Sequence, residues 1–384
     1  MKTAIVLALL GAAALAQPAL STRYTVQVGS ERLPILSDYE KWAAKLDRDN
    51  DKRLSFDEMA ATTRDLPGGL RVDPDDYVLG MGREFSGTLS HYAAGYPDSS
   101  QIESQLTAIA TAHPDLVQVT SLGPTPEGRS VTALRVGRDD GMERPRIAVV
   151  AGQHAREWMA PQVALTSLRE LLEDPSNADL LQRFEFWFVP LANPDGYEYS
   201  RTADPMWRKN RGGVEEGEAR GVDLNRNFDA DYRREGDTAE STRDDWGASD
   251  SPYSAQYRGK TPASEPETRY LQTLLDKPGL VGVVDVHGFG CKVVLPNESS
   301  DPTYLASASA MKEALGPEYE VVRYERLYPI TGHLAAYADQ RGVIGMTLEV
   351  GGAFQPNPAR IPQVAEQASR GVLAFARAMA HRQG

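Results

Sequence analysis

The chain has almost no cysteine: Cys291 is the only one among 384 residues. An internal disulfide is therefore impossible, and stability in an oxidising compartment has to come from packing and bound ions. A nucleophilic role for Cys291 is disfavoured as well, because a catalytic thiol needs an activating base beside it. We interpret Cys291 as a small buried apolar residue.

The chain also lacks an excess of positive charge and a long apolar run after its first residues. Its formal net charge is −13, which repels phosphate backbones and anionic lipid head groups. No later segment approaches the roughly 20 consecutive apolar residues that a membrane span requires. The sequence therefore argues against nucleic acid and membrane as the main partners, and we expect a monomer.

The first residues have the pattern of a secretory signal. Lys2 precedes an apolar run from Ala4 to about Leu10, and a small-residue stretch ends at Ala16. The pattern predicts a signal peptide over residues 1–16 that is cut before Gln17. A membrane anchor is disfavoured because this stretch is too short to span a bilayer. We therefore expect an exported protein, either secreted or periplasmic.

The remaining composition is that of a globular protein, with 41% apolar residues to fill a core. From about Tyr92 onward, helix-like and strand-like segments alternate, which is typical of an α/β layered domain. We assign residues 17–85 to a small N-terminal region and residues 86–384 to the catalytic domain. Helices are expected near 99–112 and 161–173, and strands near 131–136, 147–151, 184–189 and 280–286.

The small region contains a loop that resembles the calcium loop of an EF-hand, within a unit that we expect to be α-helical. The loop runs from residue 47 to residue 58, and Leu54 occupies the apolar eighth position. Lys52 stands where the pattern requires glycine for a sharp turn, so a plain acidic helix-turn-helix remains the alternative. The predicted calcium ligands are Asp47, Asp49, Asp51, Ser55 and Glu58.

Histidine is scarce as well, with six in the chain, and one of them begins a possible metal site. His154 and Glu157 stand three positions apart, directly after the apolar run 147–152. If the chain bends after a strand, an imidazole nitrogen and a carboxylate oxygen converge on one cation, a donor pair that suits zinc. Taken alone the pair is a weak signal, because a satisfied histidine and a surface glutamate produce the same pattern.

A catalytic zinc site with two histidines and one glutamate requires one more imidazole. His113 and His381 lie in polar segments, and His91 lies in a turn-rich one. His287, in contrast, ends the strand-like run 280–286 and is followed by a glycine-containing loop. Strand ends followed by loops are where α/β enzymes place their sites, so His287 is the best candidate for the third ligand.

Seven motifs in the larger domain resemble those of the zinc metallocarboxypeptidase family, which includes carboxypeptidase A. The resemblance extends from about Tyr92 to Met379, and the motifs occur in the family's order. It implies a mixed, roughly eight-stranded sheet with helices on both faces, and a zinc-dependent exopeptidase that acts on peptide C-termini. The motifs are Glu127–Ser130, Gly152–Trp158, Asn193–Tyr197, Trp207–Arg211, Gly221–Phe228, Asp285–His287 and Thr347–Glu349.

Carried over by position, the resemblance makes His154, Glu157 and His287 the ligands of one zinc ion per chain. Glu349 is implied as the general base that takes a proton from water and later gives it to the leaving amine. Arg208 is implied as the group that polarises the scissile carbonyl. Without the resemblance, Glu349 reads as an outward carboxylate and Arg208 as a surface arginine. A further carboxylate, Asp223, is expected to orient His154.

The resemblance also implies a set of substrate-binding residues. Arg226 would hold the free C-terminal carboxylate with two parallel hydrogen bonds, and Asn225 would donate another. Arg156 matches a further arginine on the substrate side. Tyr328 matches a mobile tyrosine that caps the substrate, although its spacing to Glu349 differs slightly from the family's.

The terminal side chain should contact the stretch from Gly332 to Tyr337, which carries no acidic residue. An apolar or aromatic terminal residue is therefore favoured, although Arg323 and Arg326 could admit an acidic one. Two rival functions remain. One is a related enzyme that cleaves cell-wall peptide stems or N-acyl amino acids, and the other is a binding protein that has lost catalysis.

Overall fold

The computed structural model describes residues 20–28, 31–36, 53–54, 95–212, 221–232, 247–296, 301–324 and 330–381. The chain divides into two compact units, Met1–Tyr92 and Ala93–Gly384, whereas the sequence placed the boundary after residue 85. The predicted signal segment 1–16 lies outside the described residues. Among the described residues, no helix combines the length and the apolar character that crossing a membrane requires.

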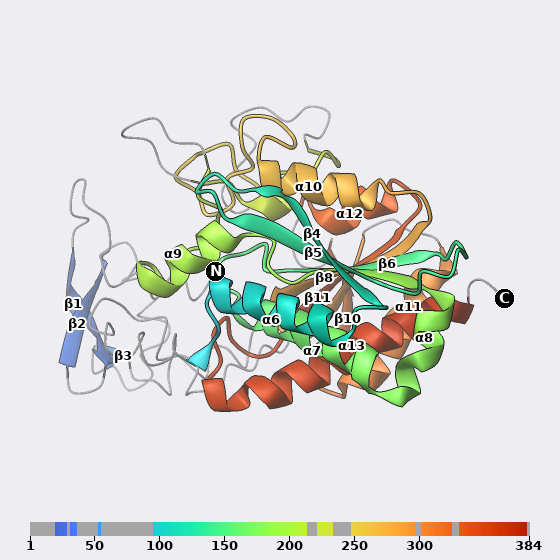
Figure 1. Cartoon of the computed structure of the whole chain (residues 1–384). Helices are drawn as coiled ribbons and strands as arrows, with labels where there is room; N and C mark the ends of the chain where they lie inside the picture. Colours follow the sequence, from blue (N-terminus) through green and yellow to red (C-terminus); the bar gives the residue numbers. More distant parts are fainter. Residues whose placement is uncertain are drawn as a thin grey trace. The chain divides into compact units, whose positions relative to one another are not determined.

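The described parts of the first unit are strands. β1 (Leu20–Val28) pairs antiparallel with β2 (Glu31–Leu36), and it pairs parallel with the short β3 (Arg53–Leu54) (Figure 1). The sequence predicted a helical unit here, so the described segments differ from that prediction. The calcium site stays a prediction, because its five proposed ligands lie outside the described residues: Asp47, Asp49, Asp51, Ser55 and Glu58.

The second unit is built on an eight-stranded mixed sheet, in the order β10-β9-β11-β8-β6-β7-β5-β4. The four central strands β11, β8, β6 and β7 are parallel, while β5 and β9 join their two sides antiparallel. The sequence-based prediction of the fold is therefore confirmed for this unit. The strands are β4 (Val117–Pro124), β5 (Ser130–Val136), β6 (Arg146–Ala151), β7 (Glu185–Val189), β8 (Leu280–Gly288), β9 (Lys292–Leu295), β10 (Glu320–Arg323) and β11 (Ile344–Val350).

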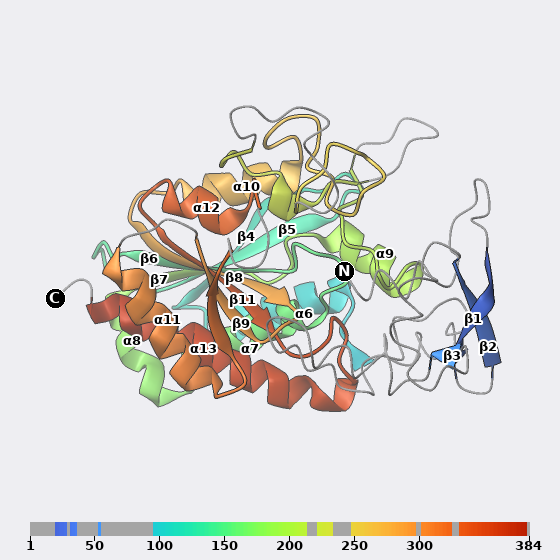
Figure 2. The ribbon, with the colours of Figure 1, turned by 180° about the vertical axis from the view of Figure 1, so that it is seen from behind.

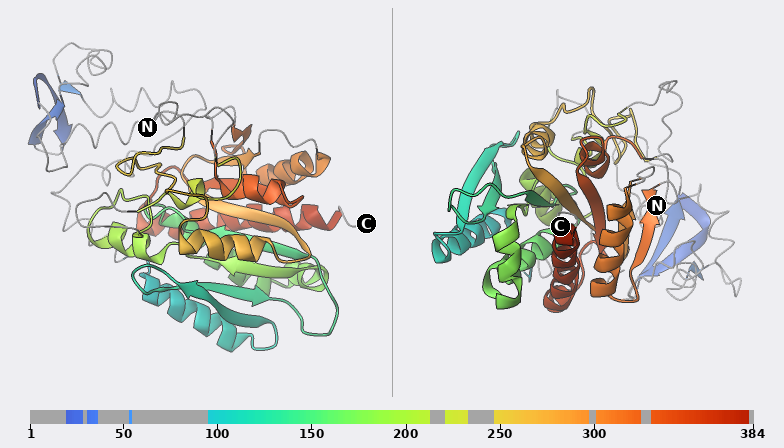
Figure 3. Two further views of the ribbon diagram at one scale, coloured as in Figure 1. Left: turned by 90° about the horizontal axis from the view of Figure 1, so that it is seen from above. Right: turned by 90° about the vertical axis from the view of Figure 1, so that its right-hand side faces the viewer.

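Helices cover both faces of the sheet. α10 and α12 pack on one face, and α7, α11 and α13 pack on the other (Figures 1 and 2). The end-on view in Figure 3 places these two helical layers on opposite sides of the twisted sheet. The α-helices are α6 (Ser99–Ala112), α7 (Met159–Glu173), α8 (Ala178–Arg183), α9 (Pro194–Thr202), α10 (Pro266–Leu275), α11 (Pro302–Leu315), α12 (Leu334–Asp339) and α13 (Ile361–His381). Three short 3₁₀ helices complete the described set: Pro175–Asn177, Leu224–Arg226 and Pro358–Arg360.

The central strand β8 separates the two faces by simple alternation. A Cβ atom at Gly282 would lie 2.8 Å from the Phe375 ring of α13, so the even-numbered positions face that helix. Val283 joins the apolar cluster that contains Leu334 and Tyr337 of α12, so the odd-numbered positions face the other way. Because side chains alternate along a strand, the later odd positions of β8 also lie on the α12 face.

Candidate metal centre and active site

The three predicted zinc ligands meet beyond the carboxyl ends of two neighbouring parallel strands. β6 is followed by the turn that carries His154 and Glu157, and His287 is the penultimate residue of β8. Ala151 and Val286 are register partners, so the two strand ends lie side by side. All three side chains are buried, with at most 4% of their surface exposed, and their ligand atoms lie within 4.8 Å of one another.

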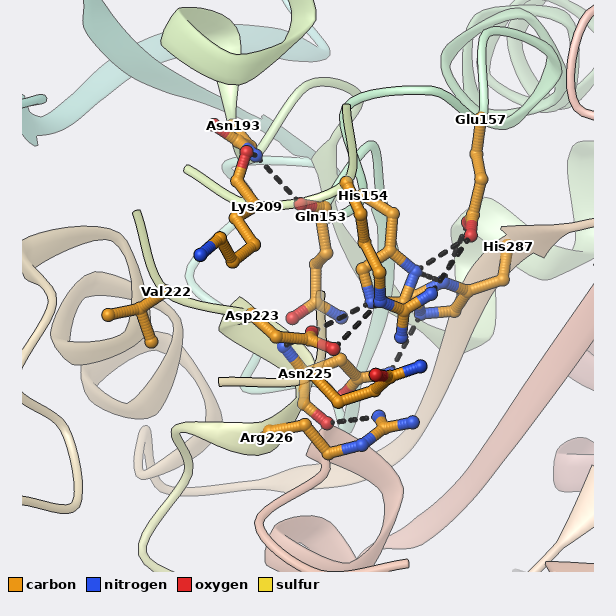
Figure 4. A network of polar contacts seen from close by, with 12 residues as sticks. Gln153, His154, Glu157, Asn193, Lys209, Val222, Asp223, Asn225, Arg226 and His287 are labelled. Atoms are coloured by element: carbon orange, nitrogen blue, oxygen red, sulfur yellow. Dashed lines mark hydrogen bonds and ion pairs between the residues drawn. The ribbon is translucent and has the colours of Figure 1, made fainter. Parts of the chain in front are cut away.

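Each imidazole is held by a carboxylate on its outer side. His154 Nε2 lies 3.0 Å from Asp223 Oδ1 (Figure 4). His287 Nε2 lies 2.8 Å from Asp285 Oδ2. In the tautomer that donates from Nε2 to these carboxylates, each Nδ1 turns its lone pair toward the centre, which is the form that binds a metal. This arrangement of ligand and supporting carboxylate is common around metal-bound histidines.

The inner atoms of the site fit a cation. The two Nδ1 atoms are 3.0 Å apart, and they lie 2.8 and 2.9 Å from the two oxygens of Glu157. Two lone pairs and a carboxylate that converge in a buried space repel one another unless a positive charge lies between them. Two imidazole nitrogens and one carboxylate oxygen are donors that zinc prefers, so the residues present fit this metal.

The charges around the centre keep the supporting acids ionised. Burial raises the pKa of Glu157, but His154 and His287 outweigh burial and hold it well below its usual range. Burial likewise raises the pKa of Asp223, and the guanidiniums of Arg208 and Arg226 outweigh it, so this pKa also falls well below its usual range. The centre therefore presents negative charge at neutral pH.

Glu349 lies on β11, next to the centre. It is the register partner of His287 on β8, so both side chains point to the same face of the sheet. Its carboxylate forms no hydrogen bond within the described part of the chain. Burial, followed by the negative charge of Glu157, raises the pKa of Glu349 to about 7. This group can therefore accept a proton near neutral pH.

Arg208 is tied to the same carboxylate that holds His154. Its Nε donates to Asp223 Oδ2 at 2.8 Å, while Asp223 Oδ1 faces the imidazole. The Nη1 atom of Arg208 lies 3.8 Å from Glu157 Oε1, so the guanidinium reaches the edge of the metal site. Asp223 thus orients a ligand and a cationic side chain at once, and the sequence predicted only the first of these contacts.

Asn225 and Arg226 lie in a short 3₁₀ helix (Leu224–Arg226) directly after Asp223. Arg226 is 2% exposed, and it donates through Nη1 to the Asn225 carbonyl at 2.7 Å and through Nε to the Gly247 carbonyl. Asn225 accepts the Leu334 amide through Oδ1 at 2.8 Å and donates through Nδ2 to Asp285 at 3.2 Å. Both side chains are therefore fixed beside the metal centre by protein contacts.

The remaining predicted residues divide between described and undescribed parts of the chain. The guanidinium of Arg156 stacks on the Phe354 ring at 4.2 Å and donates through Nη1 to the Met206 carbonyl. Burial and the charge of Arg208 lower the pKa of Arg156 to about 10. Tyr328 lies outside the described residues, so its capping role stays a prediction.

Sequence analysis missed the role of Asp285. Its Oδ1 accepts from Gln153 Nε2 at 2.7 Å while its Oδ2 faces His287, so it links the segment directly before the first ligand, His154, to the last ligand. The spacing of Asp285 and His287 contained the signal, because residues two apart on a strand share a face.

Comparisons with known proteins agree with this geometry. A family model described as zinc carboxypeptidase matches residues 102–371. Carboxypeptidase A4 of Mus musculus is 28% identical over 302 residues, which cover 74% of this chain and 69% of that protein. Carboxypeptidase B of Astacus astacus is 36% identical over 181 residues, which cover 46% of this chain and 55% of that protein. The match with the second relative thus spans little more than half of its length.

A solved structure supports the fold. The crystal structure of carboxypeptidase A from Helicoverpa armigera superposes with a TM-score of 0.68 at 22% identity, covering 91% of this chain and 83% of that one. At this identity, the likeness establishes the fold alone. The matching family model covers most of the chain, and it includes both zinc-ligand segments and the strand that bears Glu349. The chain belongs to the zinc carboxypeptidase family, a family of metal-dependent hydrolases.

Proposed function

We propose that the protein is an exported zinc-dependent carboxypeptidase that hydrolyses the last peptide bond of peptides and favours an apolar or aromatic terminal residue. The observation that carries this proposal is the convergence of two carboxylate-supported imidazoles and Glu157, next to the unbonded carboxylate of Glu349. Family membership indicates the class of reaction, and these contacts provide a metal site and a base that can carry it out.

His154, Glu157 and His287 would hold the zinc ion. Bound there, zinc would supply Lewis acidity, which polarises a carbonyl group and lowers the pKa of a water molecule. The supporting carboxylates Asp223 and Asp285 keep both imidazoles in the tautomer that turns Nδ1 inward.

Glu349 acts as the general base in this proposal. It takes one proton from the attacking water and returns it to the nitrogen of the leaving amino acid, so the proton balance closes over the reaction. Its pKa of about 7 suits both steps, because a group with a pKa near the working pH both accepts and releases protons. A bound cation would lower this pKa and favour the basic form.

Arg208 stabilises the negative charge that develops on the carbonyl oxygen of the scissile bond. Its Nε is engaged by Asp223, which fixes the guanidinium in place before the substrate arrives. Donors that need no reorganisation during the reaction are the effective ones for this task. Arg156, half-buried beside the Phe354 ring, provides a second cation for the substrate's main chain.

Arg226 and Asn225 recognise the free C-terminal carboxylate. Two N–H groups of Arg226 are engaged by main-chain carbonyls, which leaves its remaining Nη2 atom to donate to a substrate. The Nδ2 group of Asn225 donates to Asp285 Oδ2 at 3.2 Å and also lies 3.0 Å from His287 Nε2. Because that nitrogen carries a proton in the proposed tautomer, the second N–H of Asn225 can donate to the substrate. A charged donor and a neutral donor on adjacent residues suit a single carboxylate, which is the feature that distinguishes an exopeptidase substrate.

The decisive experiment is a release assay with N-blocked dipeptides, run before and after chelation and after zinc is restored. We expect release of the terminal amino acid that disappears with a chelator and returns with zinc. N-acyl amino acids serve as the competing substrates. Turnover of these alone would assign the rival amidohydrolase function, and zinc-loaded protein that cleaves neither substrate would support a binding protein that has lost catalysis.

A further inference from the structure

His333 is a buried histidine that none of the steps above uses. It is 4% exposed and precedes α12, where its Nδ1 accepts the backbone N–H of Ala336 at 3.3 Å and so caps the helix. An imidazole whose Nδ1 accepts must carry its proton on Nε2. His333 therefore presents one N–H donor whose direction is fixed by the helix cap.

No hydrogen bond joins this donor to the described part of the chain. The hydroxyl of Thr331, two residues earlier, is fully buried and has no partner there either. Thr331 is also buried. Buried polar groups in folded proteins are nearly always hydrogen-bonded, so the unpaired hydroxyl of Thr331, two residues from the Nε2 donor of His333, requires an explanation. A ligand that brings its own acceptor provides one.

The segment lies against the residues that are proposed to hold the substrate carboxylate. The amide of Leu334 donates to Asn225 Oδ1 at 2.8 Å. Gly332 has φ +66°, and a Cβ atom there would lie 2.2 Å from the Arg226 carbonyl oxygen. Because His333 stands between these two contacts, it lies directly beside the place where the terminal residue of a peptide would be held.

On its other side, His333 contacts buried side chains that lie between it and the strand of Glu349, the proposed general base. Its ring centroid lies 4.2 Å from that of Tyr324, whose hydroxyl is 2.5 Å from Thr347 Oγ1. Thr347 is two residues before Glu349 on β11, so both point to the same face. The other members of the group are apolar: Val294, Ile330 and Ala335.

We propose that His333 and Thr331 donate hydrogen bonds to the terminal side chain of the substrate, and that the enzyme prefers an uncharged side chain ending in an acceptor oxygen. Tyrosine and glutamine have such side chains, whereas phenylalanine and methionine are their apolar counterparts of similar shape. This inference rests on the proposed carboxypeptidase function and sharpens its substrate class.

The surroundings exclude a charged terminal side chain. Val294, Ile330 and Ala335 offer no counter-charge, and the nearby cation, Arg226, is proposed to hold the terminal carboxylate; a buried charge without a partner of its own is costly. Burial, with the charge of Arg226 adding to it, lowers the pKa of His333 to about 3, so the imidazole stays neutral and cannot balance a carboxylate. A site whose buried donors need an acceptor discriminates strongly against an analogue that lacks one.

The test compares kcat/KM for N-blocked dipeptides in two matched pairs, tyrosine against phenylalanine and glutamine against methionine at the terminus. We expect the acceptor-bearing member to be preferred by about tenfold or more. His333→Ser retains an oxygen that can cap α12 but removes the Nε2 donor, so the preference should fall toward unity. His333→Gln restores an N–H donor and should recover part of it.

Two further variants serve as an independent test and as a control. Thr331→Val removes the second donor at nearly constant shape and should reduce the same ratios even if a His333 variant fails to fold. His113→Ser, at the end of α6 and away from the site, should leave them unchanged.

The outcomes separate the two proposals. If no dipeptide is cleaved by the zinc-loaded protein, the carboxypeptidase function itself fails. If cleavage occurs but the wild-type ratios are near unity, or glutamate-terminated dipeptides are cleaved best, or the ratios survive both His333→Ser and Thr331→Val, the inference about His333 is overturned alone.

Discussion

The two faces of strand β8 have different roles in the catalytic unit: one packs in the apolar core, and the other carries residues of the proposed metal site. Val284 and Val286 point toward the α13 side and are fully buried among apolar neighbours. Asp285 and His287 alternate with them and point to the α12 side, where His287 is a proposed zinc ligand and Asp285 contacts its Nε2 atom. One strand thus anchors the core and the chemistry simultaneously.

This difference shows that tight packing of the side chains on the α13 face helps to hold the polar side chains on the α12 face in position. A strand whose even positions are packed at interior density cannot shift its odd positions by much. Zinc ligation needs imidazoles held within a few tenths of an ångström, and the packed α13 face supplies that constraint. Variants on the two faces should therefore separate activity from stability.

The largest effect is expected at the general base on the α12 face. Glu349→Gln removes the proton acceptor, so kcat should fall by about 10²- to 10⁴-fold. Zinc content should stay at one ion per chain, because Glu349 is not among the three residues that converge on the metal site. Metal analysis and dipeptide turnover, measured on the same sample, check the zinc content and the loss of activity. Turnover near the wild-type rate would show that Glu349 is not the general base.

The opposite result is expected on the α13 face. Phe375 is fully buried and packs against Gly282 of β8, so Phe375→Ala should lower the free energy of unfolding by about 3–5 kcal/mol. Several other side chains share the packing of this face, among them Val284, Val286 and Met379, so the remaining folded protein should keep most of its zinc affinity and kcat when these are measured well below the melting temperature. The exposed Leu305→Ala on α11 is the control, with an expected change within about 0.5 kcal/mol. A large loss of zinc affinity in Phe375→Ala would show that the two faces are not separable.

A smaller change is expected when a supporting carboxylate is neutralised. Asp285→Asn replaces the charged acceptor of His287 Nε2–H with a neutral amide, so zinc affinity should weaken by about 10- to 100-fold. Competition titration against a chelator measures the shift. As a control, the exposed Asp115→Asn variant should bind zinc as the parent protein does. An unchanged zinc affinity in Asp285→Asn would show that the Asp285 carboxylate does not support the zinc ligand His287.

The smallest expected effect is the dependence on pH. The pKa of Glu349 is raised to about 7, and only its deprotonated form is a base. kcat/KM should therefore rise with pH by about tenfold per unit on the acid side and level off at or below about pH 7, since a bound cation favours the ionised form. In Glu349→Gln, this limb should be lost from the residual rate. An acid limb that survives in that variant belongs to another group.

Local pattern predicted much of this architecture, because the informative residues are close in sequence to the elements they serve. The apolar run ending at Val286 indicated a buried strand, and His287 followed from its position at the strand end. The six-histidine inventory left few competitors. The eight-stranded sheet then followed from family resemblance and not from periodicity.

The remaining contacts could not be predicted, because they depend on residues brought together by the fold. The bond between the Leu334 amide and Asn225 joins residues 109 positions apart. Asp223 contacts both His154 and Arg208, and predicting this would have required knowing how far apart the fold places the segments that carry these three residues. In the first unit, the acidic pattern favoured a helical unit, whereas the described segments β1 and β2 are antiparallel strands. Only Gly29 and Ser30 separate them in the sequence, a hairpin signal that the sequence-based prediction did not use.

Asp223 gives the protein a single point of failure. A substitution there would remove the hydrogen-bond acceptor of His154 Nε2 and that of Arg208 Nε in one step. A redesign of the site should therefore change this position last.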